Sequence, residues 1–241
     1  MKKIIIIFLL IINTFLFSRT NEEEVKRIFR RIRKHYIKIL SSGVNYWNSY
    51  IRKRRSLVLD LSEINLDMRN LDGIDFIKVT FYGCSFKNTK MRKAILKKAF
   101  FSDCYFINTD FSYSNMYKTS IGGKDVSKNC KFYKVKFING YLSHNNIKNS
   151  DFRQSNLTKL LIRKCRIFQS NFSDAILKNI KIEVKSKFYK CNFTNANLQK
   201  ANFYLSENQK KLKWDKTQFF NCNFTRADFH GALTMNNATF K

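Results

Sequence analysis

A hydrophobic residue recurs at every fifth position through most of this chain, and this spacing constrains the fold more than any other feature. A period of five fits neither a strand, whose faces alternate every two residues, nor a helix with its period of 3.6. A fixed short repeat is instead the signature of a solenoid. Most of the 24 Phe residues fall on the series, so it is not a by-product of a Phe-rich composition. The series, here called the core positions, runs Leu61, Leu66, Leu71, Phe76, Phe81, Phe86, Met91, Leu96, Phe101, Phe106, Phe111, Met116, Ile121 and Val126; then, after a slip of one residue, Phe132, Phe137, Leu142, Ile147, Phe152, Leu157, Ile162, Ile167, Phe172, Leu177 and Ile182; then, after a second slip, Phe188, Phe193, Leu198 and Phe203; and, after an interruption, Phe219, Phe224 and Phe229.

The two residues before each core position follow a rule of their own. Two places before it stands a small or thiol-bearing residue, such as Cys84, Ala94 or Ser114, and one place before it Asn or Asp recurs, as in Asn197 and Asp228. If each five-residue unit forms one side of a square coil, the core residue and the small residue both point inward. Four units then make a coil of roughly 20 residues. Coils stack at about 4.8 Å, so like residues lie above like, with ladders of Phe inside.

This pattern resembles the pentapeptide-repeat family, whose unit is commonly written Ala-Asp/Asn-Leu/Phe-X-X. The units that carry the resemblance most clearly are Ala196-Asn197-Leu198, Ala201-Asn202-Phe203 and Ala227-Asp228-Phe229. The resemblance implies an all-β fold, a right-handed quadrilateral β-helix, which we place at residues 57–241. We expect irregular turns where the pattern is broken. Lys124 and Gly140 stand where small residues are usual, and Lys90, Ile95 and Phe100 replace Asn or Asp.

Residues 1–18 have the pattern of a secretory signal peptide. Lys2 and Lys3 precede an apolar run from Ile4 to Phe17, and the small Ser18 suits a cleavage site. The run is too short for a comfortable membrane span of about 20 residues, and an uncleaved anchor is the alternative. We therefore expect an exported protein, located in the periplasm, in the cell envelope or outside the cell.

Residues 19–56 are predicted to form a basic amphipathic helical cap and a linker. Thr20 and Glu23 make a capping box, and an apolar stripe opposes a face of Lys and Arg as far as Leu40. A solenoid must cover its first coil. The predicted helix 20–40, continued by residues 44–51, is placed to do so. Alternatively, such a helix lies on an anionic membrane.

The chain is strongly basic, with a formal net charge of +29, which falls to +27 if cleavage removes Lys2 and Lys3. Its Lys and Arg mostly follow the core positions, on the outside of the predicted coils. Such a field attracts polyanions, although an AT-rich genome would also favour Lys, Asn, Ile and Phe. Export disfavours nucleic acid as the natural partner. The candidate contacts to an anionic surface or polyanion are Arg30, Arg33, Lys34, Arg52, Lys53, Arg54, Arg55, Lys210, Lys211, Lys213 and Trp214.

The repeat breaks between Phe203 and Phe219, which predicts an inserted loop at residues 204–218. Loops on a rigid scaffold often carry binding, and Trp214 among lysines suits an anionic, partly apolar partner. A merely tolerated insertion is the alternative. After Phe229 the pattern loosens, and no helix follows to cover the last coil. That open coil suggests a homodimer formed end to end.

Six Cys in an exported chain would usually suggest three disulfides, but all six occupy the inward position for small residues. A thiol behaves there as a small hydrophobe, which favours six free thiols. With no CxxC and no nearby His, we expect neither a metal nor a cofactor. His35, His144 and His230 lie scattered, without a readable catalytic partner. The sequence therefore argues against an enzyme.

Some members of the family resemble DNA in shape and negative charge and act on topoisomerases. The opposite charge and the export signal argue against that role here. The sequence favours an exported, non-catalytic binding or scaffold protein that presents a basic solenoid surface to an acidic lipid, glycan or acidic protein. The alternative is a purely structural envelope protein without a polyanion ligand.

We predict that Phe137→Lys lowers stability far more than Lys136→Glu, one residue away. Burying a Phe contributes about 1.5–3 kcal/mol, and an unpaired buried charge costs several kcal/mol more. Lys136→Glu changes the charge by more but on the outside. Thermal unfolding of both variants tests this, and equal melting temperatures would contradict the inward assignment of the core positions.

Overall fold

A computed structural model describes residues 22–54, 59–123, 126–183, 186–203, 212–228, 233–234 and 239–240. The chain divides into two compact units, Met1–Ser42 and Gly43–Lys241. The first contains the helix α2 (Glu22–Ser41), and the second contains the helix α3 (Val44–Arg52) and all the β-structure. The predicted signal peptide and Thr20 of the predicted capping box lie outside the described residues. None of the helices that the structure describes has the length and apolar character needed to cross a membrane.

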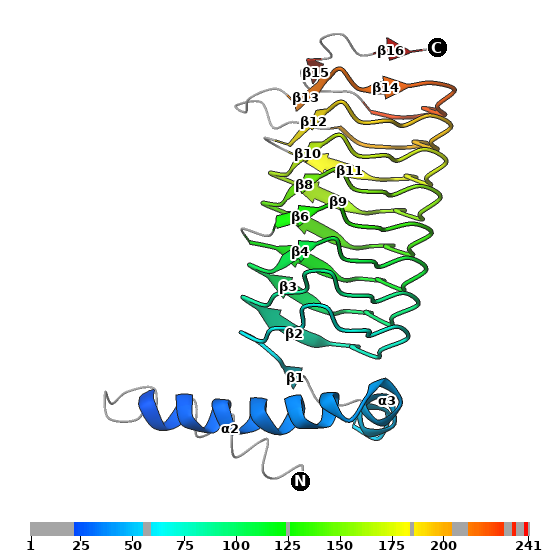
Figure 1. Cartoon of the computed structure of the whole chain (residues 1–241). Helices are drawn as coiled ribbons and strands as arrows, with labels where there is room; N and C mark the ends of the chain where they lie inside the picture. Colours follow the sequence, from blue (N-terminus) through cyan, green and yellow to red (C-terminus); the bar gives the residue numbers. More distant parts are fainter. Residues whose placement is uncertain are drawn as a thin grey trace. The chain divides into compact units, whose positions relative to one another are not determined.

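The β-structure is a solenoid of parallel strands, which confirms the predicted fold class (Figure 1). We call its two long sheets side 1 and side 2, and each has seven strands. Side 1 joins, in spatial order, β1 (Leu59–Asp60), β2 (Val79–Tyr82), β3 (Phe100–Ser102), β5 (Ser120–Gly122), β7 (Tyr141–Ser143), β9 (Leu161–Arg163) and β11 (Lys181–Glu183). Side 2 joins β4 (Tyr105–Ile107), β6 (Val126–Lys128), β8 (Asn146–Lys148), β10 (Arg166–Phe168), β12 (Lys187–Tyr189), β13 (Leu212–Asp215) and β15 (Leu233–Thr234).

The other two sides of each coil are held by single parallel bridges. Side 3 runs from Asn70 through Lys90 and Asp110 to Gln218, and near its end β14 (Gln218–Phe219) pairs with β16 (Thr239–Phe240). Side 4 runs from Asp75 to Asn223. Partners in these bridges are 20 or 21 residues apart over most of the solenoid, so four five-residue units complete one coil as predicted.

The interior contains the predicted ladders of stacked hydrophobic residues. Along side 3, Phe132 lies above Phe111 and below Phe152, with ring centroids 5.0 and 4.6 Å apart and nearly parallel planes. The stack continues through Phe172 and Phe193 at 4.6 and 4.7 Å. Such pairs add stabilisation beyond the area that they bury.

Each corner of the coil depends on two local features. The Asn or Asp before the core position accepts a hydrogen bond from the backbone N–H two residues later, as Asn197 does from Gln199 at 3.1 Å. Two residues after the core position the backbone turns left-handed, with φ between 49° and 63° at each non-glycine corner. The predicted role of the Asn and Asp residues is thereby confirmed. The same bond is made by Asp60, Asn65, Asn70, Asp75, Asp110, Asn115, Asp151, Asn156, Asn171, Asn192 and Asn223.

The small inward position also has a polar function. Where it is Thr or Cys, its hydroxyl or thiol donates to the carbonyl of a core residue one coil earlier. Thr109 donates to Phe86 at 2.7 Å, and Cys130 donates to Phe106 at 2.8 Å. These bonds satisfy buried carbonyl groups. They explain why short side chains with a donor alternate there with Ala.

One predicted core residue is wrong. The pairing of β6 with β4 and β8 places Ser127, not Val126, between Phe106 and Ile147. The first slip of the repeat therefore precedes residue 127. All three irregular spacings now fall at the same corner, between side 1 and side 2. They follow Ile121, Ile182 and Phe203.

The predicted loop at 204–218 is also shorter than expected. β13 pairs with β12 in register, with Trp214 opposite Phe188, so the repeat resumes by residue 212. The sequence signal failed because Trp replaces Phe or Leu at this position. The expected irregular turns are absent at Lys90, Ile95 and Phe100, which pair regularly with the next coil. Lys124 lies outside the described residues.

Gly140 is explained by a close contact and not by a turn. It lies in the regular backbone just before β7, and a Cβ built on it would overlap the ring of Phe137. The large core side chain therefore occupies the space that the usual small residue fills in other units.

The described residues assign the capping of the first coil to α3. Trp47 is fully buried, its ring packs edge-on against Phe76 at 5.5 Å, and its indole N–H donates to the carbonyl of Asp75 at 2.8 Å. Asn48 donates to the carbonyl of Gly73 and accepts from the N–H of Asp75, at 2.9 and 2.8 Å. The predicted continuation helix 44–51 thus performs the function that we had assigned mainly to helix 20–40.

We predict that Trp47→Ala lowers the free energy of unfolding by about 3–5 kcal/mol. The change removes a fully buried ring and leaves the Asp75 carbonyl without its donor. Tyr46→Ala is the matched control, because Tyr46 is 56% exposed. Urea unfolding measures both, and a Trp47→Ala midpoint equal to that of the control would show that α3 does not cap the coil.

Candidate functional site

Charged residues are distributed unequally over the four sides of the solenoid. Each side, with the corner that follows it, consists of the segments from one residue before to two residues after each core position. On side 4 these segments are 75–78, 95–98, 115–118, 136–139, 156–159, 176–179, 197–200 and 223–226. They contain nine Lys or Arg and a single carboxylate, Asp75, which is buried beneath α3. The nine are Lys78, Lys97, Lys98, Lys118, Lys136, Lys159, Lys178, Lys200 and Arg226.

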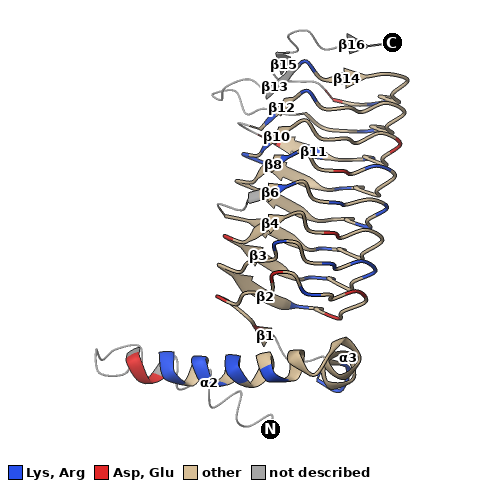
Figure 2. Cartoon of the chain, in the orientation of Figure 1, with Lys and Arg blue, Asp and Glu red and all other residues tan. Residues whose placement is uncertain are grey.

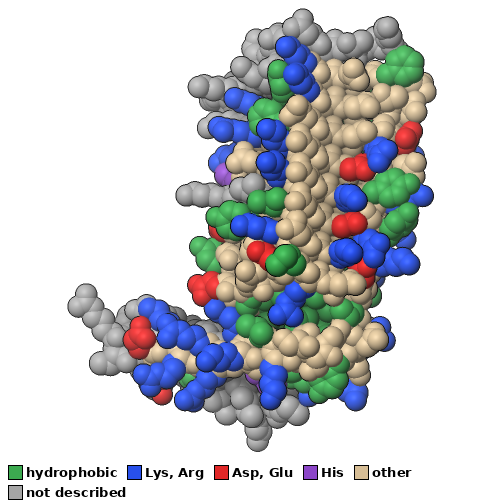
Figure 3. Space-filling view, viewed as in Figure 1, with side chains coloured by type: hydrophobic (Ala, Val, Ile, Leu, Met, Phe, Trp, Pro, Cys, Tyr) green, Lys and Arg blue, Asp and Glu red, His purple; other side chains and the backbone are tan. Residues whose placement is uncertain are grey.

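The other sides differ in sign and pattern (Figures 2 and 3). Side 2 is also basic, with eight cations and two carboxylates in its segments. Side 1 has five described carboxylates and three described cations. Side 3 alternates, because Lys90, Asp110, Lys131 and Asp151 are bridged in that order on successive coils. Opposite charges therefore stack on side 3, whereas side 4 carries cations with hardly any exposed counter-charge.

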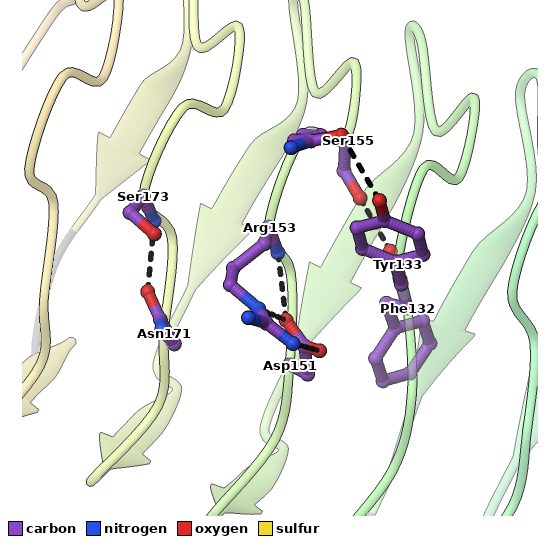
Figure 4. A network of polar contacts seen from close by, with 8 residues as sticks. Phe132, Tyr133, Asp151, Arg153, Ser155, Asn171 and Ser173 are labelled. Atoms are coloured by element: carbon purple, nitrogen blue, oxygen red, sulfur yellow. Dashed lines mark hydrogen bonds and ion pairs between the residues drawn. The ribbon is translucent and has the colours of Figure 1, made fainter.

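Side 3 contains a shallow groove of about 560 Å³. Asp151 and Arg153 form a bidentate ion pair on its floor, with nitrogen to oxygen distances of 2.9 and 2.8 Å (Figure 4). Nearby, Arg92 pairs with Asp72 of the preceding coil, and its hydrogen bonds hold the pKa of Asp72 below the ordinary value although partial burial opposes this.

Two tyrosines stand on successive coils in this groove. Tyr113 and Tyr133 pack edge to face at 5.7 Å, and the Tyr133 hydroxyl donates to Gln154 at 3.1 Å. The ammonium of Lys134 lies 5.8 and 5.2 Å from their ring centres. The ring faces are thus already approached by a cation, so the groove has a largely self-satisfied set of polar contacts.

The structure does not gather the predicted contact residues into one site. Arg30 and Lys34 are exposed and Arg33 is half-buried on α2, in the separate N-terminal unit. Arg52 and Lys53 are exposed at the end of α3.

The remaining candidates are divided between the two ends of the second unit. Arg54 is half-buried, and its guanidinium lies 3.8 Å from the centre of the Tyr50 ring. Lys213 and Trp214 belong to β13, near the C-terminal end of side 2, and not to a loop. Arg55, Lys210 and Lys211 lie outside the described residues.

The sequence reasoning missed the segregation of cations onto side 4. The signal was readable, because residues 20 or 21 apart share a side. Sorting the outer residues by that interval separates Lys78, Lys98 and Lys118 from the acidic side 1. Total charge and clusters along the chain, which guided the candidate list, do not reveal a surface built from residues so far apart.

The structure gives no sign of a metal-binding or catalytic cluster in the part of the chain that it describes. All six cysteines are free, as predicted, and five are buried while Cys222 is half-buried. Burial raises the pKa of Cys130 and of Cys191 to about 12. A hydrogen bond with Cys104, one coil away, lowers the pKa of Cys84. The thiols thus fill the interior as small side chains.

Comparison with known proteins identifies the repeat. A family model described as pentapeptide repeats matches residues 60–98, 92–123 and 185–206, in eight copies. Among solved structures, QnrB1, a plasmid-mediated fluoroquinolone resistance protein, is similar, with 14% identity over 76% of this chain and 93% of that chain and a TM-score of 0.49. HetL, a pentapeptide repeat protein involved in heterocyst differentiation regulation from the cyanobacterium Nostoc, has 15% identity over 78% and 92%, with a TM-score of 0.28. No curated protein matches the sequence.

We predict that the native protein reacts with few equivalents of a thiol reagent and that the unfolded, unreduced protein reacts with about six. At pH 9 an exposed thiol is about half ionised, whereas a folded-state pKa of about 12 keeps Cys130 and Cys191 neutral. Because the folded state binds these protons more tightly, their contribution to stability is complete below pH 9 and is lost as the pH rises toward 12. Reaction of fewer than about two thiols after unfolding would show disulfides instead.

Proposed function

The chain belongs to the pentapeptide-repeat family, and on that premise we propose that it is an exported, non-catalytic binding or scaffold protein. It holds an anionic partner on a basic side of its solenoid. Export is supported by the charged and apolar pattern of residues 1–18. The non-catalytic role is supported by the family, whose members are generally binding or scaffold proteins.

One observation carries the anionic partner, namely nine cations on side 4 against one buried carboxylate. Eight of the nine cations are exposed, and among the described residues none of the nine forms an ion pair. A rigid scaffold holds these charges in place, so binding a polyanion loses little side-chain and backbone freedom beyond that of the lysine stems. The field of the whole solenoid adds attraction at a distance.

We predict that the protein lacking residues 1–18 binds heparin and vesicles containing anionic lipid at low salt, with affinity that falls steeply as salt is added. Lys97→Gln, Lys136→Gln and Lys178→Gln together should weaken binding more than Arg30→Gln, Arg33→Gln and Lys34→Gln together, since the first set lies on side 4 and the second on α2. Both sets remove three charges.

Dissociation constants from titration at several salt concentrations measure the effect. Absence of binding to every polyanion at low salt would overturn the proposal and favour a purely structural protein. A larger loss from the α2 set would move the site to the N-terminal unit.

A further inference from the structure

The corner that follows side 4 is a row of cations on successive coils. We call it the lysine corner, and it consists of the residues two places after the core positions of side 4. Backbone hydrogen bonds fix the row, since the N–H groups of Lys78, Lys98 and Lys118 each donate to the carbonyl just before the corner residue of the next coil, at 2.9 to 3.0 Å. Neighbouring corner residues therefore rise by about 4.8 Å. The members are Lys78, Lys98, Lys118, Asn139, Lys159, Asn179, Lys200 and Arg226.

The backbone at this corner does not favour lysine. Each member has a φ between 53° and 58°, in the left-handed region that Asn tolerates better than Lys. The corner after side 2 shows the alternative, with Asn88, Asn108 and Asn129 in a row. There the amide of Asn108 donates to Asn88 at 2.8 Å, and that of Asn129 donates to Asn108 at 3.1 Å.

Compositional bias does not explain this difference. An AT-rich genome favours Lys and Asn alike, yet the chain places Asn on one corner and Lys on another. Three consecutive lysines, Lys78, Lys98 and Lys118, also replace stacked amide bonds by neighbouring like charges, which repel. On side 3 the same fold stacks Lys90 against Asp110 instead. The lysine corner therefore gives up local stability for an unneutralised line of charge.

We infer that the lysine corner is the track on which an extended acidic polysaccharide lies parallel to the solenoid axis. This inference rests on the proposed function and specifies its ligand and orientation. From Lys78 to Arg226 the row climbs seven coils, about 34 Å, so one chain bearing carboxylate or sulfate groups contacts several cations at once. Weak individual contacts then add up along a single ligand.

Two other polyanions fit this surface less well. A membrane-bound surface usually adds a group of projecting apolar side chains, whereas on side 4 Ile176 is the one large hydrophobic side chain classed as exposed, at 38%. Single-stranded nucleic acid is usually held by stacking on exposed aromatic rings. The aromatic residue beside the row, Tyr117, is half-buried and has the ammonium of Lys118 over its ring at 5.4 Å.

The test compares two triple variants of the protein lacking residues 1–18. The corner variant carries Lys98→Asn, Lys118→Asn and Lys159→Asn, and because Asn suits the left-handed backbone it should unfold at the same or a higher temperature. The control variant carries Lys87→Asn, Lys128→Asn and Lys148→Asn, three exposed residues of side 2 with the same loss of charge. The probes are size-defined heparin oligosaccharides, polygalacturonate, single-stranded DNA and anionic vesicles.

We expect the corner variant to lose about tenfold or more in affinity for long oligosaccharides, with a salt dependence that is shallower by about one unit of slope for each contacting lysine. The control should lose clearly less. Affinity of the parent protein should rise with oligosaccharide length and level off once the sugar spans the corner. Binding of both heparin and polygalacturonate would assign the contact to negative charge on a sugar chain, and binding of one alone would name the acidic group.

Equal losses in the two variants would overturn the lysine corner while leaving the proposed function intact. So would an affinity that does not depend on length. A corner variant impaired with vesicles or DNA but not with oligosaccharides would replace the polysaccharide by that ligand. A parent protein that binds no probe would end both the inference and the proposed function.

Discussion

The solenoid depends on hydrogen bonds between the backbones of successive coils. At each side, an N–H or carbonyl group of one coil meets its partner 19 to 23 residues away, as in the bond from Phe132 N–H to the Asp151 carbonyl at 2.7 Å. This ladder requires every coil to keep the same path, which the left-handed corner and the Asn or Asp bond impose every five residues. Stacked Phe rings, inward thiols and outer rows of like residues all follow from that repetition.

The same requirement explains where irregularity is allowed. Extra residues enter at the corner between side 1 and side 2, and the coil returns to register at Ser127, Phe188 and Trp214. Both ends of the ladder need partners, since unpaired strand edges invite association. α3 supplies them at the first coil by aiming the indole of Trp47 and the amide of Asn48 at backbone groups.

The sequence predicted most of the fold because the side chains that determine it recur in a fixed order along the chain. It misplaced Val126 and the return of the repeat at Trp214, where Ser127 and Trp replace the usual Phe or Leu and hide the register. It chose the longer, more amphipathic helix as the cap, although the polar contacts of Trp47 and Asn48 are made across more than 20 residues and leave no local signal. The candidate contact residues were chosen from local charge clusters, whereas side 4 is assembled from residues 20 apart.

The outer residues are nearly independent of the fold, and this independence gives the charge pattern its meaning. Coil stacking needs the inward residues and the corners, and it is indifferent to whether an exposed position holds Lys, Asp or Ser. Two exposed cations about 4.8 Å apart lie within the Debye length of about 8 Å at physiological ionic strength, so salt does not fully screen them. In water each such repulsion costs about 1 kcal/mol or less. A well-packed interior tolerates that cost, and an alternating pattern like that of side 3 would remove it. A bound polyanion removes it as well, which is why a row of uncompensated cations on a rigid corner is better understood as half of an interface than as an ordinary solvated surface.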